Sequence, residues 1–175
     1  MTWGQLVKSL NSFPTYVIEL GVQVDKKKRY DIVEVQKVSK KTGKTYIAKQ
    51  KVGESGVNNA EILYVNEFGS PARHIPPRPV LHITIDHVIK NWLPTERAKL
   101  VRLYIDGGFK TKLVEEELDK FCIRVQNYCR RIIYKNDGTL KENAPYTIAM
   151  KGDNHPLFDT GQLARSITCK YYRLN

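Results

Sequence analysis

The pattern of apolar and polar positions predicts β-structure near both ends of the chain, with helices between them. Residues 15–24 (TYVIELGVQV) are rich in β-branched and aromatic residues, which is typical of a strand. Residues 164–174 (ARSITCKYYRL) predict a strand that closes the chain. Because strands come first, helices follow and strands return, we expect an α+β fold: an antiparallel β-sheet with a long amphipathic helix and shorter helices packed on one face.

The clearest helical signal covers residues 113–134, which we expect to form the core helix. Their apolar residues recur at offsets of three, four and seven, and this places them along one stripe of a helix. Shorter helices are predicted at residues 5–10, 80–92 and 96–105, the last two separated by Pro94. The stripe of the long helix consists of Val114, Leu118, Phe121, Cys122, Val125, Cys129, Ile132 and Ile133.

Residues 59–68 (NAEILYVNEF) give a mixed signal. They fit a helix capped by Asn58 or Asn59 and stopped by Gly69, but a strand explains the same residues. The apolar positions at helical spacing are Ile62, Val65 and Phe68.

Two further segments are predicted to be irregular. Residues 70–80 (SPARHIPPRPV) contain several prolines, which lack amide donors and fix φ, so no regular element is expected before Pro79. Pro79 suits the first turn of the helix that follows. Residues 135–156 predict a long loop with a short strand at residues 146–150.

A basic hairpin is predicted at residues 26–51. Two strand-like stretches, residues 29–38 and 44–52, flank a loop in which Gly43 can adopt the positive φ that such a turn requires. These 26 residues include ten basic residues and two acidic ones, a balance of +8 within a formal net charge of +11. Because its faces are mostly charged, we expect an arm that projects from the body.

Length and composition indicate a single folded domain covering residues 1–175. Hydrophobic residues make up 41% of the chain and charged residues 27%, which is ordinary for a globular fold. No apolar run approaches the roughly 20 residues that a membrane-spanning helix needs, so no membrane contact and no secretory signal are expected. Cys122 and Cys129 lie seven apart on the apolar stripe, which favours reduced thiols in the core.

Candidate catalytic residues are sparse. A hydrolase would draw on His155, Asp159 and Thr160, or on His82 with its neighbours Asp86 and His87. Nucleophilic catalysis needs a nucleophile, a base and a group that orients the base, and no known motif supplies this set. The histidines and cysteines also lack the spacing of metal ligands. We therefore expect no enzymatic activity, no cofactor and no metal.

The lysine-rich hairpin raises the alternative of nucleic-acid binding. Tyr30 and Tyr46 lie among the lysines, where aromatic rings stack on bases in other proteins. A solvated hairpin whose charge discourages edge pairing explains the same residues and is the interpretation that we favour. The candidate contacts to DNA or to an acidic partner are Lys26, Lys27, Lys28, Arg29, Lys40, Lys41 and Lys44.

Two longer segments carry a family resemblance. Residues 59–81 (NAEILYVNEFGSPARHIPPRPVL) and 143–171 (NAPYTIAMKGDNHPLFDTGQLARSITCKY) resemble, in order and spacing, the paired signatures of the tail-completion and neck proteins of tailed bacteriophages. The resemblance implies a non-enzymatic α+β virion protein, made in the bacterial host cytoplasm, that forms a homo-oligomeric ring around the DNA passage at the head-to-tail junction. Its partners would be copies of itself and other connector and tail proteins, with non-specific contact to genomic DNA. The hairpin does not match the family pattern, and a tail terminator ring or a basic DNA-binding accessory protein are the alternatives.

The two signatures also suggest local roles. In FDTGQL, the Asp159 carboxylate is expected to accept hydrogen bonds from the amides of Gly161 and Gln162, and Leu163 to enter the core or an interface. Arg78 is predicted either to pair with a carboxylate of a neighbouring subunit or to face solvent. The candidate interface residues are Glu67, Phe68, Gly69, Pro77, Arg78, Pro79, Asp159, Thr160, Gly161 and Leu163.

Overall fold

A computed structural model describes residues 3–23 and 28–174 and confirms the α+β class. Its strands form two separate antiparallel pairs, β1 with β4 and β2 with β3. The elements in chain order are α1 Trp3–Asn11, β1 Thr15–Val22, β2 Tyr30–Val38, β3 Thr45–Glu54, α2 Asn59–Phe68, the 3₁₀ turn η2 Pro71–Arg73, α3 Val80–His87, the π-helix η3 Val88–Trp92, α4 Leu93–Asp106, α5 Lys112–Lys135, α6 Pro145–Lys151, α7 Gln162–Ser166 and β4 Ile167–Leu174.

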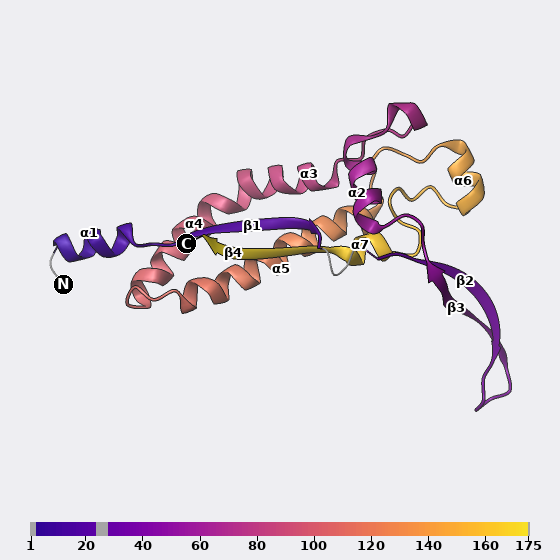
Figure 1. Ribbon diagram of the computed structural model, residues 1–175, viewed down its shortest axis with the longest axis horizontal. Helices are drawn as coiled ribbons and strands as arrows, with labels where there is room; N and C mark the ends of the chain where they lie inside the picture. The colour runs from indigo at the N-terminus through magenta and orange to yellow at the C-terminus, as the bar shows by residue number, and fades with distance from the viewer. Residues whose placement is uncertain (1–2, 24–27, 175) are drawn as a thin grey trace.

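The predicted core helix is confirmed as α5, which packs against the β1–β4 pair (Figure 1). The pair joins the two ends of the chain, with Thr15 opposite Leu174 and Val22 opposite Ile167. The apolar stripe of α5 faces this pair and α3, where residues such as Leu118 are almost completely buried. Burial of this stripe removes a large apolar area from water and is the main stabilising feature of the body. Cys122 and Cys129 are buried free thiols, as expected.

The two helices predicted on either side of Pro94 are one uninterrupted helical stretch. α3 continues through η3 into α4, and Pro94 lies in the first turn of α4. Proline normally ends a helix because it lacks an amide donor and crowds the preceding turn. Directly before Pro94 the helix widens into a π turn, in which backbone hydrogen bonds join residues five apart. The helix therefore continues through Pro94 without a break.

The helix prediction for residues 59–68 is confirmed, and the strand alternative is wrong. Asn58 and Glu61 form a reciprocal capping box at the start of α2, and Gly69 ends the helix at a φ of +76°. The buried apolar residue of α2 is Leu63, whereas Phe68 is 59% exposed.

Two strand predictions near the C-terminus are corrected. Residues 146–150 belong to the helix α6, which starts at Pro145 and ends at Gly152 with a φ of +71°. The last strand begins at Ile167, because residues 162–166 form the short helix α7. Short apolar runs fit either element, and periodicity does not separate them.

The predicted hairpin is present and projects from the body (Figure 1). Its strands pair from Tyr30 opposite Glu54 to Val38 opposite Thr45, and Gly43 adopts a φ of +66° in the turn. No residue of β2 or β3 is buried. The predicted start of the arm at residues 26–27, and residue 24 of the first predicted strand, lie outside the described residues. α1 extends at the opposite end of the molecule, as Figure 1 shows.

Candidate functional site

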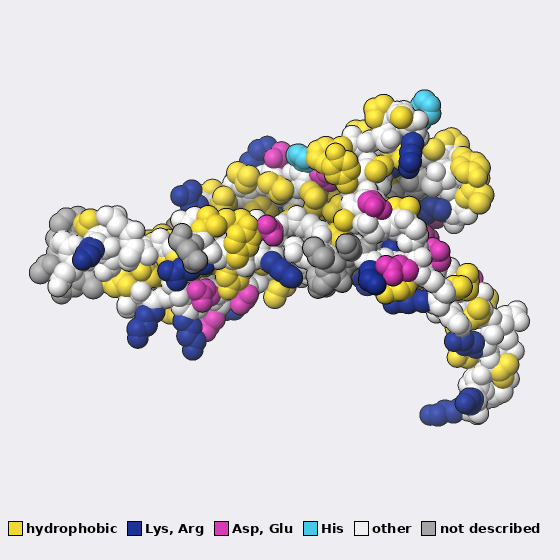
Figure 2. All heavy atoms as spheres, in the orientation of Figure 1, with side chains coloured by type: hydrophobic (Ala, Val, Ile, Leu, Met, Phe, Trp, Pro, Cys, Tyr) yellow, Lys and Arg dark blue, Asp and Glu magenta, His cyan; other side chains and the backbone are white. Residues whose placement is uncertain are grey.

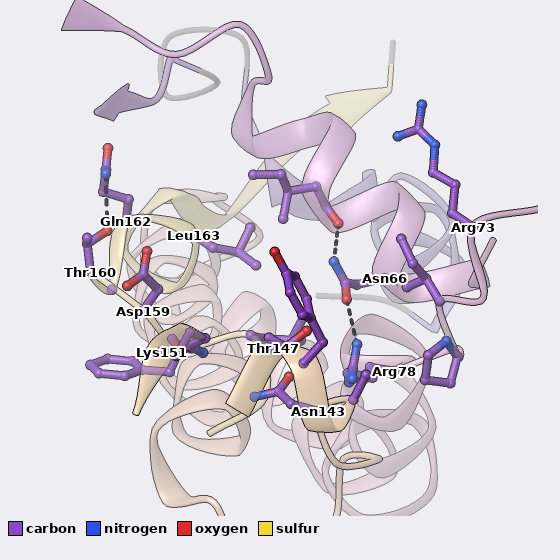
Figure 3. A pocket seen from close by; sticks show the side chains of 18 of the residues that line it. Asn66, Arg73, Arg78, Asn143, Thr147, Lys151, Asp159, Thr160, Gln162 and Leu163 are labelled. Atoms are coloured by element: carbon purple, nitrogen blue, oxygen red, sulfur yellow. Dashed lines mark hydrogen bonds between the residues drawn. The ribbon is translucent and has the colours of Figure 1, made fainter. Parts of the chain in front are cut away.

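The two signature segments meet at a cleft of about 480 Å³ (Figure 3). One wall comes from α2 and the proline-rich connector after it, and the other from α6 and the corner at residues 157–163. We call this hollow the corner cleft. Arg29, Arg73 and Lys151 line it beside a single carboxylate, that of Asp159. Its lining is therefore basic.

Arg78 forms the floor of the corner cleft and corrects both predictions for this residue. It is only 6% exposed, and its Nε and Nη2 atoms each donate a 2.7 Å hydrogen bond, to the carbonyls of Lys141 and Glu142. Its Nη1 donates to Asn66 Oδ1 at 3.1 Å, as Figure 3 shows. Burial lowers the pKa of the guanidinium from its ordinary value. Arg78 therefore joins the connector to the loop before α6, and it neither faces solvent nor remains free for a neighbouring subunit.

Glu67 is likewise committed to its own chain. Its side chain is buried, and its carboxylate accepts hydrogen bonds from the amides of Leu81 at 2.9 Å and His82 at 2.8 Å. His82 Nδ1 lies 2.6 Å from the same carboxylate. Free amides and the helix dipole make the first turn of α3 a favourable place for this charge. Glu67 thus fixes α2 against α3, and its role at a subunit interface stays a prediction.

Asp159 does not form the predicted cap. α7 starts after Gly161 without any side-chain cap, and the Asp159 carboxylate lies 3.6 Å from Arg29 Nη2 at the base of the hairpin. The Asp159 side chain is 63% exposed, so this ion pair is a weak one. The Asp159 carboxylate therefore pairs with Arg29, which is far away in the sequence, and does not cap α7.

Gln162 anchors the hairpin, a role that was not predicted from the sequence. Its Oε1 accepts a hydrogen bond from the Tyr30 amide at 2.9 Å, and its Nε2 donates to the Tyr30 carbonyl at 2.8 Å. This is the pairing that a neighbouring strand would make. Asn59 adds a bond from its Nδ2 to the Lys28 carbonyl at 3.0 Å. The only available signal was the position of Gln162 inside the FDTGQL motif, which does not specify a partner.

The glycines of the two corners leave room for close neighbours, which are side chains at Gly161 and backbone atoms at Gly69. It has a φ of +74°, and a Cβ there would lie 2.9 Å from Arg165 Nη1 and 3.3 Å from the Phe158 ring. At Gly69 a Cβ would lie 2.9 Å from the Ile75 carbonyl oxygen. Leu163 is 3% exposed and belongs to the core, which was one of its two predicted positions.

The other interface candidates remain accessible. Phe68, Pro77 and Asp159 are exposed, while Pro79 and Thr160 are half-buried. In the cleft, the Nδ2 of Asn143 is buried without a hydrogen-bond partner among the described residues. A buried unpaired donor of this kind is commonly satisfied by an ordered water molecule. The basic lining of the corner cleft suits an acidic group.

The histidines considered for catalysis have structural partners. His155 Nε2 donates to the Ile133 carbonyl at 2.7 Å, and its ring stacks on Phe158. His87 stacks on Tyr128, with 4.3 Å between the ring centroids. Within the described parts of the chain, no three histidine, cysteine or acidic side chains gather closely enough to hold a metal ion.

The hairpin presents the remaining candidate contacts to solvent. Lys28 forms a 3.2 Å ion pair with Glu54 at its base, whereas Lys40, Lys41 and Lys44 are exposed at its tip. None of these three tip lysines forms an ion pair with a described residue. Lys26 and Lys27 lie outside the described residues.

Comparison of the chain with protein-family models, with curated proteins and with solved structures gives no match. Among the described residues, no helix combines the length and the apolar character needed to cross a bilayer.

Proposed function

We propose that this protein is a structural subunit of a tailed-phage virion, acting as a neck or tail-completion protein that forms a ring around the DNA passage at the head-to-tail junction. The observation that carries the proposal is the hairpin, an arm that is fixed at its base and leaves several large apolar side chains exposed. Val38, Ile47 and Val52 are 63%, 66% and 64% exposed.

An arm of this kind supports a role in assembly. A two-stranded hairpin alone is marginally stable in water, and exposed apolar strands attract other chains. This hairpin is held at its root by Gln162, Asn59 and the Arg29–Asp159 ion pair. A fixed root limits the entropy lost when the arm docks, so the chain is prepared to bind a neighbour.

The signature segments support the same function in a different way. Their polar residues are largely used within the chain, where they hold the connector, α6 and the hairpin root in one arrangement. The cleft between them remains open and basic. A fixed outer shape with one open recess fits a subunit that stacks on other rings.

Two measurements test the proposal. Light scattering gives the mass of the purified protein, and negative-stain images show whether rings form. In parallel, the protein is added to heads and tails from an infection in which it is not made. Restored joining and infectivity are expected. Particles that join equally well without it would refute the proposal.

DNA binding by the hairpin is the second candidate, favoured by the exposed lysines at its tip. Phosphate contacts by lysine release counterions, so affinity for duplex DNA would fall steeply with added salt. A fluorescence titration at several salt concentrations measures this slope. Absence of binding at low salt would remove the candidate.

A further inference from the structure

The β1–β4 pair has an open edge. β4 covers one side of β1, and no other strand in the described parts of the chain pairs with the opposite side. In an antiparallel pair, alternate residues direct their amide and carbonyl groups away from the partner strand. About half of the backbone polar groups of β1 therefore face outward, where another strand can bond to them.

An apolar groove follows this open edge between β1 and α3. Two adjoining hollows of about 260 Å³ and 290 Å³ share Ile85 in their walls. We define the β1–α3 groove by Ile18, Leu20, Val22, Phe68, Ile85 and Ile89. Figure 2 shows hydrophobic side chains gathered over α3 and along β1. Ile85 and Ile89 are 43% and 53% exposed although they border the core. A third strand laid beside β1 would cover them.

The chain itself contains an element with the matching properties. β2 and β3 span nine and ten residues against eight for β1, and no third strand in the described parts of the chain pairs with their outer edges. On β2, Gln162 occupies only the backbone groups of Tyr30. The exposed apolar side chains of β2 and β3 match the apolar lining of the groove. The hairpin points away from the groove of its own chain, as Figure 1 shows, so the contact has to be made to another copy.

We propose that the hairpin of one copy adds to the β1 edge of the next copy and lies across its β1–α3 groove. This deepens the proposed function, on which it rests for self-assembly, by naming both surfaces of the subunit contact. Main-chain bonds to β1 supply affinity, and the apolar residues of the arm fill the groove. Because the arm and the groove are different surfaces, the contact is head-to-tail and closes into a ring when the rotation permits.

Charge favours this pairing over hairpin-to-hairpin contact. Residues 30–54 hold six lysines and three acidic residues, six minus three giving +3, so two arms repel each other. The only charged residue of β1 is Glu19, which is exposed. Lys49 and Lys51 lie on β3 on either side of Gln50, between Ala48 and Val52, and their long side chains can reach solvent while the strand is covered.

Introduced thiols test the contact directly. Ile47→Cys in the hairpin and Ile89→Cys in the groove are placed in separate chains, one of them carrying a mass tag, then mixed and oxidised. A disulfide between the tagged and untagged chains, located by mass spectrometry, is expected. Ile123→Cys is the matched control, because Ile123 lies on α5 outside the groove and is 58% exposed. Linkage to Ile123→Cys as efficient as to Ile89→Cys would overturn the proposal.

The same pair in one chain is then examined in assembled particles. A ladder of linked subunits on a non-reducing gel is expected, since each arm reaches the next copy. Particles that contain the double variant but yield only unlinked chains would overturn the proposal, even if the protein is monomeric in solution.

Lysine substitutions identify which segment covers the groove. Ile47→Lys and Ile89→Lys are each expected to reduce incorporation into particles about tenfold or more, while Ile123→Lys and Val7→Lys on α1 leave it unchanged. Circular dichroism verifies that all four variants fold.

If Val7→Lys abolishes incorporation and Ile47→Lys does not, α1 is the occupant and the proposal is wrong. If Ile47→Lys joins heads to tails normally while the wild-type protein is required, only this contact is refuted. If heads and tails join without the wild-type protein, the proposed function itself is wrong.

Discussion

The corner cleft and the hairpin differ in how completely the chain satisfies its own chemical groups. At the corners, the buried charges of Arg78 and Glu67 are each bonded to backbone groups of neighbouring segments. Along the hairpin, apolar side chains such as Ile47 and Val38 are mostly exposed. The corners therefore hold neighbouring segments of the chain together, whereas the arm leaves apolar surface exposed to water.

The hairpin root connects these two regions. Gln162 bonds both backbone groups of Tyr30, so the signature corner positions the first residue of the arm. The FDTGQL motif therefore influences where the arm leaves the body. Changes in the corner should affect stability, and changes along the arm should affect association.

The largest effect is expected in the core of the body, away from both regions. Leu118 is 1% exposed, and Leu118→Asp would bury an unpaired charge at a cost of about 4 kcal/mol or more. Loss of soluble protein on expression is the expected outcome. Ile123→Asp on the exposed face of the same helix is the control and should express normally. A soluble Leu118→Asp variant with wild-type urea unfolding would contradict the core assignment.

Arg78→Met tests whether the corner is held from inside. It removes three hydrogen bonds and leaves the carbonyls of Lys141 and Glu142 without this donor, so we expect the free energy of unfolding to fall by about 3 kcal/mol. Urea denaturation measures the change. Arg73→Met, at an exposed position on the same connector, should change stability by less than about 0.5 kcal/mol. Equal effects of the two substitutions would mean that Arg78 does not hold the loop.

Gly161→Ala separates backbone strain from steric conflict. Alanine at a φ of +74° is strained, and its Cβ would also meet Arg165 and Phe158, so a loss of about 2 kcal/mol is expected. Gly152→Ala is the matched control, because Gly152 has a φ of +71° and open space around it. Its loss should be about 1 kcal/mol from strain alone. If thermal unfolding finds no difference between the two variants, Gly161 is not a close-approach position.

The smallest effects concern the root of the arm. Gln162→Ala should raise hydrogen exchange at the β2 amides and lower stability by about 1 kcal/mol, because it removes two bonds to Tyr30. Asp159→Ala should cost no more than about 0.5 kcal/mol, since it removes only an exposed ion pair. The reverse order would indicate that Asp159 is the true anchor.

Local sequence signals predicted much of the fold. The apolar period of α5, the capping box of α2 and the glycines at positions 43 and 69 act over a few residues, so each can be recognised without knowledge of the rest of the chain. Local signals misled the prediction at two places. Residues 146–150 form a helix, and Pro94 lies within a continuous helical stretch.

The amino-acid sequence by itself determined which segments are regular, where they turn, and that a basic arm interrupts them. Only the tertiary structure decided what the polar residues of the signatures do: Arg78 bonds residues 141 and 142, and Gln162 bonds Tyr30 across 132 positions. The physical reason is that a helix or a turn is selected by neighbours within a few residues. A buried charge or amide is paired with whichever group the packing of distant segments brings within hydrogen-bond reach.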